Sequence, residues 1–260
     1  MPTFNLRPFR PSNFQRLGIA ALGWCAPWLA HAAIPVCEAR SGQQRTPVIE
    51  LYTSEGCSSC PPADQWLSAL KGKPAVVQAF HVGYWDYIGW VDRFASPAYT
   101  SRQRELASTN QLRSIYTPQV VRDGLDWPGW NSYLRSTPSA LAAGASIDLQ
   151  RSAAAASDTE QFVAQVSPAP GVKSWSAYWT ITEHSHSSRV KAGENKGENL
   201  QHDFVVRQYT PVGRYQGPQT LRFAAPPAQA EHARQINLVV HDPQTHIPLQ
   251  AISLQCAGGG

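Results

Sequence analysis

The sequence PVIELYTSEGCSSCPP occupies residues 47–62, and the prediction of the fold starts from it. Its first seven residues form a β-prone run, and Cys57 and Cys60 follow this run with two serines between them. The two prolines open a further segment, ADQWLSALKG, in which apolar residues recur at helical spacing. This order predicts a strand, a Cys-x-x-Cys loop and a helix.

The cysteine pair is the strongest chemical signal in the chain. Two thiols three positions apart close a disulfide at small backbone cost and form a two-electron couple. Since a helix N-terminus favours a thiolate, we expect Cys57 to be the nucleophile and Cys60 to resolve the mixed disulfide. Pro61 and Pro62 suit the first positions of a helix, which moves its expected start toward Cys60 and weakens the dipole at Cys57.

Other kinds of site compete with a redox pair. A structural disulfide is one alternative, because exported proteins use such bridges freely. Copper held by the two thiols and a histidine is another, because thiolate and imidazole ligands suit that metal. A zinc site would need a second ligand pair, and no second Cys-x-x-Cys occurs in the sequence. The main prediction is therefore a site without metal or other cofactor.

The rest of the first half alternates between strand and helix patterns. These predict strands at Ala75–His81 and Ile115–Arg122, and helices at Thr100–Leu112 and Asn131–Leu141.

Thr117 and Pro118 lie just before the residues QVVRD of the later strand. After a strand, a Cys-x-x-Cys loop and a helix, a proline here is expected to be cis and to face the disulfide. The neighbouring backbone is then free to pair with an extended substrate. Taken alone, the same dipeptide reads as an ordinary loop.

An aromatic segment follows the strand at Ala75–His81. His81 at the end of the strand, and Tyr84 and Trp85 in this segment, are candidates for a substrate-binding wall beside the disulfide. His81 is also a candidate for tuning Cys57 by its charge. The alternative is that these rings fill the core of an insertion.

The second half consists almost entirely of short alternating runs separated by Pro, Gly and Asn clusters, which predict a small antiparallel sandwich. Within it, GENKGENLQHDFVVR (residues 193–207) reads as tight turns that lead into a strand. We therefore expect an α/β domain over residues 34–143, followed by a mainly β, sandwich-like domain over residues 144–256.

Several long stretches resemble a bacterial family of exported, thioredoxin-like proteins catalogued as a domain of unknown function. The stretches are VIELYTSEGCSSCPPAD, AFHVGYWDYIGWVDRFASP, RSIYTPQVVRDG and GENKGENLQHDFVVR. The resemblance implies a thioredoxin-like fold for the first domain and no established activity. By similarity, Cys57 and Cys60 match the redox pair, and Thr117-Pro118 match the cis-proline position. Glu50 is the nearest match to the buried acid that moves a proton for the resolving cysteine, one residue further from the motif.

Residues 1–32 have the pattern of a signal peptide. Arg7, Arg10 and Arg16 precede the apolar run Leu17–Ala30, and small residues at Ala30 and Ala32 suit a signal peptidase. The run is shorter than the roughly 20 residues of a membrane span, although an N-terminal anchor is the alternative. We expect a periplasmic or secreted protein with no stable membrane insertion after cleavage.

Charge and composition narrow the class of partner. Loss of the three arginines lowers the net charge from +4 to +1, which gives no reason to expect a nucleic-acid or membrane-surface partner. With 42% hydrophobic and 15% charged residues, the chain can bury a core, so wholesale disorder is excluded.

Beyond the Cys57/Cys60 pair, we expect Cys37 and Cys256 to form a structural disulfide between the ends of the mature chain.

The predicted function is thiol–disulfide exchange. We expect an exported oxidoreductase that acts on protein or small-molecule thiols or disulfides and exchanges electrons with a redox partner protein. The alternative is a copper-binding or partner-docking module in which the Cys57–Cys60 bridge is structural.

Overall fold

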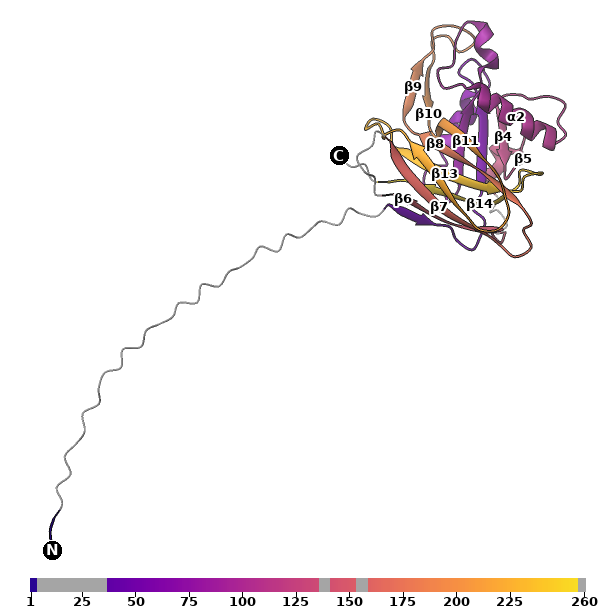
Figure 1. Cartoon of the computed structure of the whole chain (residues 1–260). Helices are drawn as coiled ribbons and strands as arrows, with labels where there is room; N and C mark the ends of the chain where they lie inside the picture. Colours follow the sequence, from indigo (N-terminus) through magenta and orange to yellow (C-terminus); the bar gives the residue numbers. More distant parts are fainter. Residues whose placement is uncertain (4–36, 136–140, 153–158, 257–260) are drawn as a thin grey trace. The chain divides into compact units, whose positions relative to one another are not determined.

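The computed structural model describes residues 1–3, 37–135, 141–152 and 159–256, and Figure 1 shows its elements. Contacts between residues divide the chain into Met1–Pro35 and Val36–Gly260, and the fold lies in the second unit. Apart from its first three residues, the predicted signal peptide lies outside the described part. None of the described helices is long and apolar enough to cross a membrane.

One eight-stranded sheet contains strands from both halves of the chain (Figure 1). In spatial order its strands are β14 (Pro248–Leu254), β13 (Arg234–His241), β8 (Trp175–Glu183), β11 (Val205–Tyr215), β3 (Val76–His81), β2 (Val48–Thr53), β4 (Gln119–Arg122) and β5 (Leu125–Asp126). β3 is parallel to β2 on one side and to β11 on the other, where Val205 lies opposite Ala79. The remaining neighbours are antiparallel.

The expected fold class, a thioredoxin-like α/β domain followed by a sandwich-like β domain, is wrong. The described residues are mostly β, with three sheets and only short helices. Strands β2 and β3 of the first half continue through β11 into β8, β13 and β14 of the second half within one sheet. The physical reason is that alternating patterns reveal strands but not their partners, and β11 completes the otherwise unpaired edge of β3. The division of the chain into two domains, at residues 34–143 and 144–256, stays a prediction.

The helices are α1 (Pro61–Ser68), α2 (Pro97–Thr109) and the 3-10 helices η1 (Gly83–Ile88) and η2 (Trp130–Arg135). α2 overlaps the helix expected at Thr100–Leu112, and it begins earlier because Ser96 caps it and Pro97 takes its first position. Of the helix expected at Asn131–Leu141, the described part is the 3-10 helix η2, and residues 136–140 lie outside the description.

A four-stranded antiparallel sheet covers one end of the large sheet. Its strands are β1 (Glu38–Arg40), β6 (Ala145–Arg151), β7 (Glu160–Pro168) and β12 (Gln219–Ala225). Buried and exposed residues alternate along β6, so one face packs inward and the other meets solvent. Its inward face shares one apolar cluster with β8, β13 and β14, in which Trp179 stacks on Phe223 with ring centroids 5.1 Å apart. The expected Cys37–Cys256 disulfide is present and joins the two ends of this region.

A small two-stranded sheet carries the turn that reaches the cysteine pair. Its strands are β9 (His186–Arg189) and β10 (Asn199–His202), and β10 packs against α1. The turn between them contains the GENKGEN sequence.

A buried ion pair in the first half of the chain accepts a hydrogen bond from the second half. Arg102 of α2 donates to both oxygens of Glu50 on β2, at 2.9 Å from Nε and 2.6 Å from Nη2. Tyr52 of β2 and Tyr178 of β8 donate hydrogen bonds to the same carboxylate at 2.7 and 2.9 Å. Burial alone would raise the pKa of Glu50, but Arg102 and the tyrosine hydrogen bonds lower it below the ordinary value.

Replacement of Arg102 by Met is expected to lower the free energy of unfolding by about 3–5 kcal/mol, because it leaves the Glu50 carboxylate buried without its cation. Urea unfolding of the variant and of wild type measures the difference. Arg104→Met, an exposed position on the same helix, is the control and should change stability by less than about 0.5 kcal/mol. Equal effects of the two substitutions would contradict a central role for the ion pair.

The folded protein is also expected to lose stability in acid because of His241. Burial, together with the charges of Arg102 and His246, lowers the pKa of His241 to about 4, against the opposing effect of the hydrogen bond to the Asp242 carbonyl. The unfolded chain then binds a proton near pH 6.5 that the folded state takes up only near pH 4, so stability falls as pH drops between these values.

Across this window the histidine accounts for a loss of about 3 kcal/mol. His241→Gln should flatten the decline between pH 6.5 and 4 relative to wild type, as measured by urea unfolding at a series of pH values. Parallel curves for the two proteins would show that His241 is not responsible.

Candidate functional site

Cys57 and Cys60 form a disulfide between the end of β2 and the start of α1. Cys60 is the N-cap of α1, and its carbonyl accepts hydrogen bonds from the N–H groups of Ala63 and Asp64. The helix therefore begins just after Cys60, near where the two prolines predicted it, and its dipole acts mainly there rather than at Cys57. Both cysteines are buried, at 1% and 0% exposure, whereas the two serines between them are exposed.

The turn between β9 and β10 covers the cysteine loop. The buried side chain of Asn195 donates from Nδ2 to the carbonyls of Glu55 (2.9 Å) and Cys57 (3.0 Å). Beside it, the Glu194 carboxylate accepts a hydrogen bond from the Ser58 N–H at 3.1 Å. The GENKGEN sequence, expected to form tight turns, is thus also a part of the site, some 138 residues away from Cys57 in sequence.

The aromatic helix η1 and the proline loop lie next to the same loop. A Cβ atom at Gly56 would lie 3.1 Å from Cβ of Trp85, so the close approach of η1 favours glycine there. Trp85 donates from Nε1 to Oγ1 of Thr117 at 2.8 Å. The Thr117–Pro118 peptide bond is cis, as expected for this position. Trp85 and Thr117 are therefore gathered near the cysteine loop.

Glu50 and Tyr84 have other surroundings. The Glu50 carboxylate accepts four hydrogen bonds from Arg102, Tyr52 and Tyr178, which favours a structural role over proton transfer to Cys60. Tyr84 packs against the apolar cluster that contains Tyr52 and Phe80. Their roles in catalysis and in substrate binding stay predictions.

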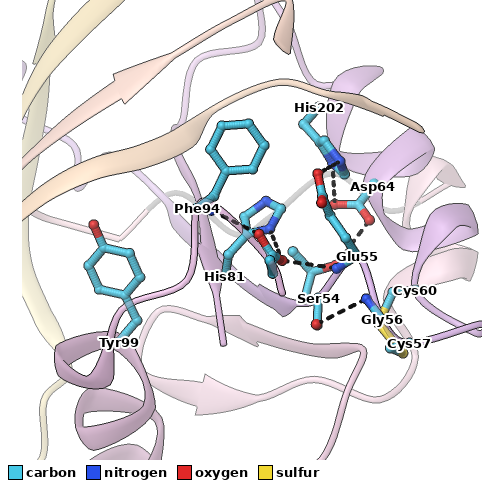
Figure 2. Close-up of polar contacts among 12 residues, drawn as sticks. Ser54, Glu55, Gly56, Cys57, Cys60, Asp64, His81, Phe94, Tyr99 and His202 are labelled. Carbon is cyan, nitrogen blue, oxygen red and sulfur yellow. Dashed lines mark hydrogen bonds and ion pairs between the residues drawn. A yellow bond between two sulfur atoms is a disulfide. The ribbon is translucent and has the colours of Figure 1, made fainter. Parts of the chain in front are cut away.

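His81 lies at the end of β3 in a buried cluster (Figure 2). Its Nδ1 is 2.7 Å from Oδ2 of Asp92, and Asp92 also accepts hydrogen bonds from the N–H groups of Glu55 and Phe94 at 2.9 Å. Burial would raise the pKa of Asp92, but His81 and these backbone donors lower it below the ordinary value. The other ring nitrogen of His81, Nε2, is buried without a hydrogen-bond partner among the described residues.

His202, at the end of β10, faces two carboxylates (Figure 2). Its Nε2 is 3.3 Å from Oε1 of Glu55, and its Nδ1 is 3.8 Å from Oδ1 of Asp64. Burial would lower the pKa of His202, but Asp64 and Glu55 together raise it to about 9. The rings of His202 and His81 are 4.9 Å apart between centroids.

Four of these residues were not predicted as parts of a site. Sequence reasoning treated His202 as part of a turn region and attached no role to Glu55, Asp64 and Asp92. Asp92 and His202 come from segments far from Glu55 and Asp64, so no spacing in the sequence groups all four residues. The usable signals were Glu55 and Asp64 on either side of the cysteine motif and the length of the GENKGENLQHDFVVR stretch.

Loss of the Asn195 side chain is expected to expose the disulfide, because two hydrogen bonds hold the turn over the loop. At about 0.5–1.5 kcal/mol each, their removal by Asn195→Ala should speed reduction of Cys57–Cys60 by dithiothreitol roughly tenfold. Timed alkylation of the released thiols measures the rate.

Asn199→Ala is the matched control, since Asn199 lies in the same segment and is exposed. It should leave the rate unchanged. If Asn195→Ala is reduced no faster than wild type, the turn does not limit access to the disulfide.

Comparisons with known proteins agree on the fold and name no activity. The chain resembles protein AGR_C_4864 from Agrobacterium tumefaciens, whose crystal structure has a TM-score of 0.55 at 24% identity and covers 82% of this chain and 96% of that one. HBP35 of Porphyromonas gingivalis is similar with a TM-score of 0.58 at 13% identity, over 82% of this chain and 76% of that one. At these identities the likeness concerns the fold alone.

Curated proteins provide no match. The family model described as a protein of unknown function, DUF1223, matches residues 48–241. This range includes both cysteines of the loop, the proline loop and the turn that covers them. The chain therefore belongs to the DUF1223 family.

Proposed function

We propose that the protein is an exported thiol–disulfide oxidoreductase in which Cys57 and Cys60 are the reacting pair. The observation that carries the proposal is the disulfide between these residues at the start of α1, in a loop whose two central serines are exposed. Thiols at this spacing interconvert between dithiol and disulfide within one loop.

The exchange proceeds in two balanced steps. In the reducing direction, the Cys57 thiolate attacks a partner disulfide, a mixed disulfide forms, and one partner sulfur leaves as a thiolate that takes up a proton. The Cys60 thiolate then attacks Sγ of Cys57, which restores the Cys57–Cys60 bond and releases the second partner thiol. The partner gains two electrons and two protons, and a redox partner protein must reduce the pair again for turnover. Oxidation of a partner uses the same steps in reverse.

Access to the pair requires movement of the covering turn. Attack needs contact between a sulfur atom and the partner, and both cysteines are buried while Asn195 and Glu194 bind the loop. The turn would therefore act as a cover that opens before exchange, which makes the reaction selective for partners that displace it.

Exposed rings near the loop favour a protein partner. Tyr87 is exposed and stacks on Trp85 with ring centroids 6.5 Å apart, and Tyr116 is exposed directly before the Thr117–Pro118 bond. Such rings supply contact area for an extended peptide beside the disulfide. Export is proposed from the signal-peptide pattern, and the two disulfides suit an oxidising compartment.

The reduction potential of the pair tests the proposal. In glutathione or dithiothreitol redox buffers, the Cys57–Cys60 couple should equilibrate between about −120 and −270 mV, the range of known exchange catalysts. A potential below about −300 mV would mark a structural bridge and support the partner-docking alternative.

Variants extend this test to activity. Cys57→Ser/Cys60→Ser should abolish reduction of insulin disulfides, whereas Cys37→Ser/Cys256→Ser, which removes the other disulfide, should retain it. Cys60→Ser alone should trap partners as mixed disulfides in cells. The absence of both insulin reduction and trapped adducts would contradict the proposal.

A further inference from the structure

We propose that Asp64, His81 and His202, with Glu55, form a binding site for a divalent transition-metal ion of the zinc class. Asp64, His81 and His202 come from α1, β3 and β10, and one ligand atom of each lies within 4.8 Å of the others. All three residues are buried, at 7%, 0% and 2% exposure. Figure 2 shows the three side chains. Two imidazoles with carboxylate oxygens are a common ligand set for zinc.

His81 is oriented as a metal-binding histidine. Its Nδ1 lies 2.7 Å from Oδ2 of Asp92, so in the tautomer with the proton on Nδ1 the ring donates a hydrogen bond to that carboxylate and Nε2 keeps its lone pair. Asp92 is itself held by the N–H groups of Glu55 and Phe94. A carboxylate behind a histidine in this way orients the ring and increases its basicity toward a metal. Nε2, buried and without a hydrogen-bond partner among the described residues, is the atom left for the ion.

In each of the two remaining carboxylates, one oxygen accepts a hydrogen bond from a neighbouring side chain. Oδ2 of Asp64 accepts a hydrogen bond from Thr53 at 2.9 Å, and Oε2 of Glu55 accepts one from Trp90 at 2.7 Å. The second oxygens, Oδ1 of Asp64 and Oε1 of Glu55, both face the ring of His202. Oε1 of Glu55 and both ring nitrogens of His202 have no partner that meets hydrogen-bond geometry in the part of the chain that the structure describes. The side chains of Glu55 and Asp64 are therefore held in place, and the ligand atoms that they and His202 offer face one another.

Charge in the cluster favours a cation. Three buried carboxylates, Glu55, Asp64 and Asp92, share this space with two imidazoles, so negative charge remains in excess even when His202 carries a proton. Burial of unbalanced charge is costly, and a divalent ion would balance it.

A cavity connects the cluster to solvent. It has a volume of about 400 Å³, and both Asp64 and His202 contribute to its lining. Glu194 and Glu198 of the β9–β10 turn line the same cavity, so its surface is acidic. A cation would enter along this wall and reach Asp64 and His202 before His81, which lies deeper.

Metal binding by the full mature chain, dialysed against EDTA with its disulfides oxidised, tests the site. We expect one Zn²⁺ per chain by isothermal titration and elemental analysis, a higher unfolding temperature with Zn²⁺, and Co²⁺ absorption bands of an imidazole-containing site. The variants His81→Gln and Asp64→Asn should each weaken Zn²⁺ binding at least tenfold, and Asp92→Asn, which only positions His81, should weaken it about 10- to 100-fold.

Two control variants distinguish this site from metal binding elsewhere in the chain. His241→Gln removes a buried histidine outside the cluster and should bind Zn²⁺ as wild type does. Cys57→Ser/Cys60→Ser should also keep the ion, which distinguishes the site from copper or zinc held by the thiols and makes the result independent of the proposed redox activity.

A measurement on the wild-type chain guards against variants that fail to fold. NMR of the histidine ring nitrogens should show that Zn²⁺ shifts one nitrogen of His81 and one of His202 and leaves the signals of His241 in place. No Zn²⁺ uptake by folded wild-type protein, or shifts confined to other histidines, would overturn the proposal and leave a protonated His202 as the cation of the cluster.

Discussion

The parallel pairing of β11 with β3 is the constraint on which the site depends. The Ala79 N–H donates to the carbonyl of Phe204 at 2.8 Å, so the chain that enters β11 is held along the edge of β3. His202 and the β9–β10 turn directly precede this point in sequence, and the pairing brings them to the cysteine loop. Without β11, backbone groups at the edge of β3 would stay unpaired. The site would also lack the residues that come from the second half of the chain.

The disulfide and the cluster of Glu55, Asp64, His81 and His202 lie next to each other. Glu55 lies two residues before Cys57, and the Asp64 N–H donates to the carbonyl of Cys60 at 3.1 Å. A cation among these side chains would add positive charge close to the first turn of α1, where it would favour a cysteine thiolate. The two proposals are therefore chemically compatible, although neither requires the other.

Glu50 has contacts that the resemblance did not predict. The resemblance pointed to this residue as the nearest match to a buried acid on the strand before the cysteines, one residue further from the motif. In the structure its carboxylate is occupied by Arg102 and two tyrosines, so it joins β2, α2 and β8. The acids next to the cysteine motif are Glu55 and Asp64, and their environment became visible only when His202 was placed beside them.

The sequence by itself determined the local features: the strand before Cys57, the helix start just after Cys60 and the Cys57–Cys60 pair, because adjacent residues decide backbone propensity and short loop closure. The tertiary structure decided which strands share a sheet, which side chains surround the disulfide and what covers it. Those outcomes depend on contacts such as Val205 with Ala79 and Asn195 with Cys57, between segments more than a hundred residues apart. Alternating patterns carry no information on such partners, since every half-buried strand presents the same period-2 signal.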